Sequence, residues 1–253
     1  MPLELTYDQS IGTAGKLDIY LTVGGPVVVL VQHGGWLPVD KRDGWMTPWA
    51  DAFVAAGYSV VIANWRSATA YKYPTALYDL DHAIRVAERY LAQAYGCIRC
   101  PLNLIGFSSG ANLAPLWALN RAAYSREHYD HQLQIATVIG LAGPYDLTAA
   151  DLPELAESLI AGWMTSSSWE ALASPITYAP LAAGLGARWL LMHGELDDIV
   201  PYTQATAMYA ALDAEPGVDV ALSGYELMGH EIGQYTSDGW ADRLDNIIGF
   251  IED

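Results

Sequence analysis

Short runs of almost continuous apolar residues alternate with amphipathic segments, and this alternation constrains the fold more than any other feature. A strand that is apolar throughout is buried on both faces, as in a parallel sheet covered by helices. The runs that we expect to form strands are 17–23, 26–32, 58–65, 102–107, 135–143, 188–194 and 218–227. The segments that we expect to form helices are 45–56, 75–95, 109–123, 203–212 and 240–251. The sequence therefore predicts an α/β fold, a mostly parallel sheet with helices on both faces.

The length and apolar content favour one domain that spans residues 1–253. Of these 253 residues, 52% are hydrophobic and 16% are charged, which is enough to supply one large buried core. Residues 148–187 interrupt the alternation of strands and helices, and a structureless loop of that length would be unusual. We expect this segment to pack as a short lid or wall beside the functional site.

The charge and the start of the chain suggest a soluble protein whose partners are neither nucleic acid nor anionic membranes. A net charge of −17 disfavours nucleic acid and anionic membranes as partners, because both would be repelled. No run approaches the roughly 20 apolar residues of a membrane span. The start, MPLELTYDQS, resembles no secretory signal, so a cytoplasmic location is expected.

The pentapeptide Gly-Phe-Ser-Ser-Gly at 106–110 matches the pattern G-x-S-x-G and lies between an expected strand and an expected helix. In this setting a sharp turn holds the serine in a strained conformation, and the flanking glycines let the two backbones pass closely. The N-terminus of the helix favours negative charge near the serine. We therefore predict that Ser108 is a nucleophile; the alternative is an N-cap serine on a turn.

A serine nucleophile of this kind is followed along the chain by an acid and then by a histidine. His193 and His230 both follow strand-like segments, but His193 precedes every good acid candidate. His230 lies on a glycine-flanked loop past the last expected strand and is the predicted base. The acid is expected in the loop after the preceding strand, which offers Glu195, Asp197 and Asp198.

The loop after the second expected strand reads His33-Gly34-Gly35-Trp36. Acyl transfer places negative charge on a carbonyl oxygen, and fixed backbone N–H donors must meet that charge. Consecutive glycines allow the backbone to approach a substrate closely. We expect the donors to be the N–H group of Ser109 and that of Gly34, Gly35 or Trp36, with His33 bracing the loop.

The two cysteines, Cys97 and Cys100, form the spacing C-x-x-C. A redox pair or half of a zinc site would also have this spacing, but no second pair of ligands completes a metal site. We interpret them as incidental turn cysteines that could form a local disulfide. No metal and no cofactor are expected.

These motifs together resemble the esterase/lipase group of α/β-hydrolases with an HGG-type oxyanion loop, a group that includes acetyl and feruloyl esterases and arylformamidases. The resemblance extends from about residue 17 to the C-terminus. LDIYL followed by HGGW resembles the opening LDIYLP…HGGGW of that group, and GFSSGANLA resembles GFSAGGNLA. HGELDDIVP resembles HGxxDxxVP, which marks Asp197 as the acid and leaves Asp198 as the fallback. Two departures are an oxyanion motif shorter by one residue and Ala111 in place of a common glycine.

The resemblance implies a serine hydrolase that acts on small-molecule carboxylic esters, with short-chain or aromatic esters as the expected substrates. Several aromatic residues fall in expected loops near strand ends, where they could line an apolar pocket or belong to the core. The pocket candidates are Tyr145, Trp163 and Trp169. The alternatives are an amide hydrolase with the same triad, either an arylformamidase or a short-peptide peptidase, and an inactive binding protein that keeps the fold.

Overall fold

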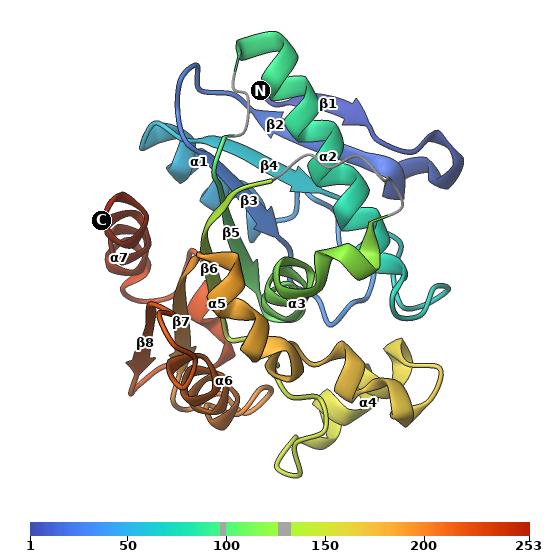
Figure 1. The fold of residues 1–253 in the computed structure, drawn as a ribbon, viewed down its shortest axis with the longest axis vertical. Coiled ribbons are helices and arrows are strands. Elements are labelled where there is room, and N and C mark those ends of the chain that lie inside the picture. Colours follow the sequence, from blue (N-terminus) through green and yellow to red (C-terminus); the bar gives the residue numbers. More distant parts are fainter. Residues whose placement is uncertain (97–99, 126–132) are drawn as a thin grey trace.

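The computed structural model describes residues 1–96, 100–125 and 133–253, and in this part of the chain one eight-stranded sheet forms the centre of the molecule (Figure 1). The strands are β1 (Leu3–Thr6), β2 (Lys16–Tyr20), β3 (Val27–Val31), β4 (Ser59–Ala63), β5 (Leu102–Phe107), β6 (Ile135–Leu141), β7 (Arg188–Gly194) and β8 (Val220–Tyr225). Their spatial order is β1-β2-β4-β3-β5-β6-β7-β8. The strands from β4 to β8 in this order pair in parallel, whereas β1 pairs antiparallel with β2 and β2 pairs antiparallel with β4. The predicted mostly parallel sheet is confirmed.

Helices cover both faces of the sheet, because each central strand is apolar on both sides. In β3, Val27, Val29 and Val31 belong to a core that also contains residues of α2, α3 and α6. Val28 and Leu30 point to the other face, into a core with α1 and α7. The helices are α1 (Met46–Ala55), α2 (Thr75–Tyr95), α3 (Ser109–Tyr124), α4 (Glu154–Trp163), α5 (Ala182–Leu185), α6 (Thr203–Asp213) and α7 (Trp240–Glu252).

The segment 148–187 contains α4, α5 and three short 3-10 helices between them, η2 (Ser167–Trp169), η3 (Ala171–Ala173) and η4 (Pro175–Leu181). The η4 turn packs against α3 and α6. Asn112 of α3 is fully buried, and its side-chain amide donates to the carbonyl of Ala173 at 2.9 Å. These contacts fix the second half of the segment to the main body and leave α4 at its outer end (Figure 1).

The N-terminal strand β1 is an element that the sequence analysis missed. It has only four residues, none of them buried, so it lacks the continuous apolar run that marks the central strands. Its pairing with β2 brings Glu4 opposite Asp18 at the edge of the sheet. Only the pairing itself identifies such a short edge strand.

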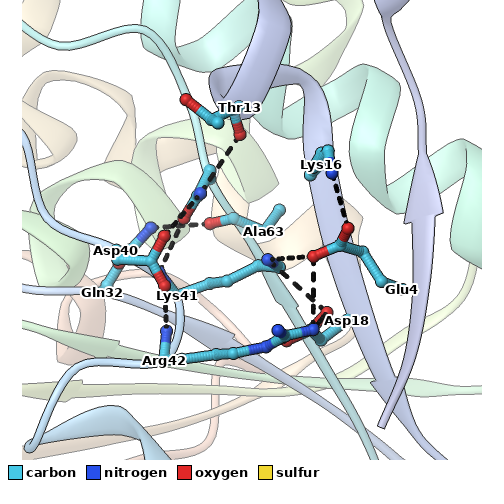
Figure 2. Close-up of polar contacts among 10 residues, drawn as sticks. Glu4, Thr13, Lys16, Asp18, Gln32, Asp40, Lys41, Arg42 and Ala63 are labelled. Carbon is cyan, nitrogen blue, oxygen red and sulfur yellow. Dashed lines mark hydrogen bonds and ion pairs between the residues drawn. The ribbon is translucent and has the colours of Figure 1, made fainter.

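A cluster of charged side chains ties β1 and β2 to the loop that precedes α1 (Figure 2). The side chain of Lys41 is only 3% exposed, and its Nζ lies 3.0 Å from Oε2 of Glu4 and 3.5 Å from Oδ1 of Asp18. Arg42 donates to both carboxylate oxygens of Asp18, and Lys16 lies 2.7 Å from Glu4. The hydrogen bonds from Lys16 and Lys41 lower the pKa of Glu4 to about 2.

A local disulfide between the two cysteines and the absence of a membrane span were both expected from the sequence. Cys100 is disulfide-bonded, whereas Cys97 lies outside the described residues. Among the helices of the described ranges, none combines the length and the apolar character needed to cross a membrane.

Candidate active site

Ser108 occupies the turn between β5 and α3, with a φ of 52° and a ψ of −119°. Such a conformation is costly for a residue with a Cβ and persists only where the surroundings hold it. The surroundings here are closely crossing backbones: a Cβ on Gly106 would lie 2.2 Å from the carbonyl oxygen of Gly110, and one on Gly110 would lie 2.0 Å from that of Val31. The strained turn expected from the G-x-S-x-G motif is therefore present, and it depends on both glycines.

His230 connects Ser108 to Asp197, although the three residues are far apart in the sequence. Its Nε2 lies 2.9 Å from Oγ of Ser108, and its Nδ1 lies 2.8 Å from Oδ2 of Asp197. A carboxylate only accepts hydrogen bonds, so Nδ1 carries the proton and Nε2 is free to accept the hydroxyl proton of Ser108. This is the tautomer that a histidine needs in order to act as a base toward serine.

The carboxylate of Asp197 has partners on both oxygens. The backbone N–H groups of Ile199 and Val200 donate to Oδ1 at 2.9 and 2.8 Å, and Nε2 of the fully buried His193 lies 3.2 Å from Oδ2. Burial by itself would raise the pKa of Asp197, but the hydrogen bonds from His193 and His230 outweigh it and hold that pKa far below its usual range. Asp197 is therefore ionised at neutral pH.

The alternatives for the acid, Glu195 and Asp198, are exposed, and neither side chain reaches His230 in the described structure. His193, which the sequence analysis excluded as the base because of its position, contacts the acid instead. Its Nε2 also lies 2.8 Å from the carbonyl oxygen of Val200, which can only accept, so this nitrogen carries a proton.

The loop after β3 presents backbone N–H groups to the same site. Gly34, Gly35 and Trp36 all have positive φ values, of 111°, 61° and 60°. Within the described ranges, their N–H groups and that of Ser109 donate no hydrogen bond to another residue. All four residues line the cavity beside Ser108, so these donors are available to a ligand oxygen.

His33 at the start of this loop pairs with Asp43, a residue that the sequence analysis did not single out. Nε2 of His33 lies 2.6 Å from Oδ2 of Asp43, while Oδ1 of Asp43 accepts from the N–H groups of Trp45 and Met46. The imidazole ring of His33 also lies 4.5 Å from the ring of Trp45. These contacts join the loop to the start of α1, as expected for a bracing histidine. An aspartate shortly before a predicted helix was the available signal.

A cavity of about 220 Å³ opens beside Ser108. A cavity of about 150 Å³ is enough to hold a benzene ring, so this space suits a short acyl chain or one aromatic ring. Its walls come mainly from the loop after β3, from α4 and from the loop that carries the acid. The lining residues are His33, Gly34, Gly35, Trp36, Trp45, Ser108, Ser109, Pro144, Leu155, Ala156, Leu159, Ile160, Ile199, Val200 and His230.

The structure does not bring the three expected pocket residues to this cavity. Tyr145 and Trp163 are buried elsewhere, at 0% and 1% exposure, and Trp169 is 41% exposed on η2. The segment 148–187 contributes aliphatic residues of α4 instead, among them Leu155 and Leu159. Their spacing of four residues is that of one helix face, a signal that attention to aromatic residues overlooked.

The BD-FAE family model matches residues 17–212, more than half of the chain. The chain belongs to the BD-FAE family. Ser108 and Asp197 lie inside the matched range, and His230 lies beyond its end.

Three similar proteins illustrate what this chain resembles. Esterase LipQ of Mycobacterium tuberculosis (strain ATCC 25618 / H37Rv) is 28% identical over an alignment of 225 residues that covers 82% of this chain but only 52% of LipQ, so the chain spans about half the length of that relative. Thermogutta terrifontis esterase 2 phosphonylated by sarin superposes with a TM-score of 0.83 at 18% identity, covering 99% of this chain and 94% of the other. A bifunctional GH43-CE protein of Bacteroides eggerthii superposes with a TM-score of 0.80 at 22% identity, covering 99% of this chain and 38% of the other. These likenesses confirm the α/β-hydrolase type of fold.

Proposed function

We propose that this protein is a serine hydrolase that cleaves carboxylic esters of short-chain or aromatic acids through an acyl-enzyme. The observation that carries the proposal is the chain of hydrogen bonds from Ser108 through His230 to the ionised Asp197. The name of LipQ as an esterase and the phosphonylated esterase 2 agree with it. We also propose that residues 1–253 act as one domain, with 148–187 as the segment beside the site.

The geometry supports a two-step reaction. Oγ of Ser108 attacks the acyl carbon while Nε2 of His230 takes the hydroxyl proton, and the carbonyl oxygen becomes an oxyanion held by the free backbone N–H groups. Collapse of this intermediate breaks the bond to the alcohol oxygen, which leaves with the proton from His230. Water, deprotonated by His230, then attacks the acyl-enzyme, and Ser108 recovers its proton as the acid product forms. Asp197 keeps the tautomer of His230 and stabilises the imidazolium in both steps.

The cavity supports a neutral acyl group as the substrate. Among the described residues that line it there is no lysine or arginine, so a carboxylate or phosphate on the acyl part would lose its hydration without gaining a lysine or arginine as a counter-charge. Aliphatic side chains dominate the wall that α4 provides. The net charge of −17 continues to disfavour nucleic acid and anionic membranes, and the cytoplasmic location expected from the sequence stays a prediction.

The alternatives are amide hydrolysis with the same residues and an inactive protein that only binds. Matched ester and anilide substrates with the same acyl group distinguish an esterase from an amide hydrolase, because an esterase turns over the ester much faster. A fluorophosphonate distinguishes an active hydrolase from an inactive binding protein, because only an activated serine forms a covalent adduct with it.

We expect Ser108→Ala to lower the hydrolysis of p-nitrophenyl acetate by more than about a thousandfold and to prevent labelling by the fluorophosphonate.

Asp197→Asn should lower kcat by about a thousandfold or more, because an amide at this position favours the wrong tautomer of His230. Its matched control, Asp198→Asn, changes an exposed neighbour and should leave kcat near the wild-type value. Circular dichroism verifies the fold of each variant. Near-normal activity of Ser108→Ala would refute the mechanism.

A further inference from the structure

Residues 33–36, the loop after β3, are called the oxyanion loop from here on. This loop holds an unusual backbone conformation at a residue that is not glycine. Trp36 follows Gly34 and Gly35 in the left-handed region with a φ of 60°. A bulky side chain makes this conformation costly, so it persists only where packing around the residue over-determines it. The conformation of Trp36 therefore depends on what holds its side chain.

The indole ring of Trp36 is held by stacking on Trp163. The two ring centroids lie 4.5 Å apart, with an angle of 11° between the planes. Trp36 is 3% exposed, and its Nε1 has no hydrogen-bond partner among the described residues. Because no hydrogen bond orients the ring, its position depends on packing, and Trp163 supplies the face that packs flat against it.

Trp163 is itself fixed by the segment that leads into α2. Its carbonyl oxygen accepts from the N–H group of Tyr73 at 3.0 Å, and the ring of Tyr73 meets its ring edge-on at 5.4 Å. Lys72 donates to the carbonyl of Gly162 next to it. The same segment reaches the oxyanion loop, because the N–H group of Ala68 donates to the carbonyl of Trp36 at 2.8 Å. The stacked pair is thus anchored at both partners.

Trp163 does not line the cavity, so it cannot influence catalysis by touching the acyl group. We propose that Trp163 is a positioning residue: stacked on Trp36, it keeps the backbone donors of the oxyanion loop directed at the site next to Ser108. This inference rests on the proposed ester hydrolysis. It gives the segment 148–187 a part in stabilising the transition state, separate from the part that Leu155 and Leu159 play in the pocket wall.

The test compares two replacements of similar size. Trp163→Phe keeps an aromatic face for Trp36, whereas Trp163→Leu fills a similar volume without one, so general loss of packing affects both alike. Trp169→Ala is the matched control, because Trp169 is exposed and contacts the ring of Tyr73 but not Trp36. Active sites are counted by stoichiometric labelling with a fluorophosphonate, so that kcat refers to folded, competent enzyme only.

We expect Trp163→Leu to lower kcat per labelled site by about tenfold to a hundredfold, because displacing a donor costs less than removing it, which lowers kcat by about a hundredfold to a thousandfold. KM should change by less than about threefold, and the loss should be the same for p-nitrophenyl acetate and butyrate. The inhibition constant of a trifluoromethyl ketone, which forms an oxyanion on the enzyme, should rise by the same factor. Trp163→Phe should recover most of the loss, and Trp169→Ala should match the wild type.

Two results would overturn the inference. One is a kcat per labelled site that stays normal in Trp163→Leu, which would leave Trp163 with a packing role only. The other is a loss that differs between acetate and butyrate, which would make Trp163 a determinant of acyl specificity. Failure of the proposed function is a different result: the wild-type protein would then either take up no fluorophosphonate, as an inactive protein, or hydrolyse the matched anilide as fast as the ester, as an amide hydrolase.

Discussion

At the scale of single residues, the turn that carries Ser108 depends on the absence of two Cβ atoms. Gly106 and Gly110 lie where the end of β5, the start of α3 and the end of β3 approach one another within van der Waals distance. The groups that an added methyl would meet are backbone atoms, which cannot rotate away as a side chain can. A substitution there must therefore move the strand or the helix that holds Ser108.

We expect Gly110→Ala to destabilise the fold by about 3 kcal/mol, as overpacking of a fixed backbone does. For a chain of this size that is a fall in Tm of about 6–12 °C. Activity per folded molecule should also fall, because the displacement reaches Ser108. Gly249→Ala in α7 is the control: its Cβ would meet nothing within 4 Å, so it should be neutral or stabilise by up to about 1 kcal/mol. Calorimetry and p-nitrophenyl acetate assays measure both effects, and an unchanged Tm in Gly110→Ala would contradict the close approach.

At the scale of elements, α4 illustrates how one helix serves two purposes with two sets of residues. Its C-terminal residue, Trp163, packs on Trp36 in the loop after β3, and Leu155 and Leu159 line the cavity. Leu159 also lies over Gly35, where an added Cβ would come within 2.9 Å of its Cδ1. The size of the cavity beside Ser108 is therefore set in part by α4.

Leu159→Ala should enlarge the cavity and favour longer acyl chains. Each extra methylene that fits contributes about 0.8 kcal/mol, so the ratio of kcat/KM between hexanoate and acetate esters should rise about fourfold for each one. Leu172→Ala is the control, because Leu172 belongs to the same segment but is exposed and does not line the cavity. Equal chain-length profiles for both variants and the wild type would exclude α4 from the pocket wall.

At the scale of the whole molecule, the parallel sheet brings distant parts of the chain to one edge. The loop of the proposed oxyanion donors follows β3, Ser108 follows β5, Asp197 follows β7 and His230 comes after β8. Carboxyl ends of parallel strands share one side of a sheet, which is where ligands of open α/β folds bind. The strands at the β1 side of the sheet also hold a loop in place. The charged cluster of Figure 2 ties β1 and β2 to the loop before α1.

This cluster predicts an acid-sensitive stability. The pKa of Glu4 is lowered to about 2 from 4.5, so the unfolded chain takes up a proton below about pH 4.5 that the folded chain does not accept until about pH 2. The contribution of Glu4 to stability is therefore complete above pH 4.5 and is lost as the pH falls toward 2. In urea unfolding between pH 6 and 2.5, the free energy of unfolding should fall less steeply with pH for Glu4→Gln than for the wild type. Glu226→Gln, an exposed control, should keep the wild-type slope; identical slopes for all three proteins would contradict the role of Glu4.

Much of this arrangement could be predicted from the sequence, because its signals are local. Continuous apolar runs predicted the central strands, and chain order placed Ser108, an acid and His230 each after a different expected strand. Backbone strain at Ser108 followed from the G-x-S-x-G motif and its position between a strand and a helix. Asp197 was singled out by a resemblance of motifs, since spacing alone left Glu195 and Asp198 open.

What remained open depends on contacts between segments that are distant along the chain. The sequence by itself determined the fold class and the residue types at the site, because strand burial, turn chemistry and chain order are written in neighbouring residues. Only the tertiary structure decided which side chains meet: His193 against Asp197, His33 against Asp43, and Trp163 against Trp36. An aromatic residue in a loop has the same sequence signature whether it faces a substrate or another ring. That choice depends on how the segment 148–187 packs against the rest of the chain, which no local pattern specifies.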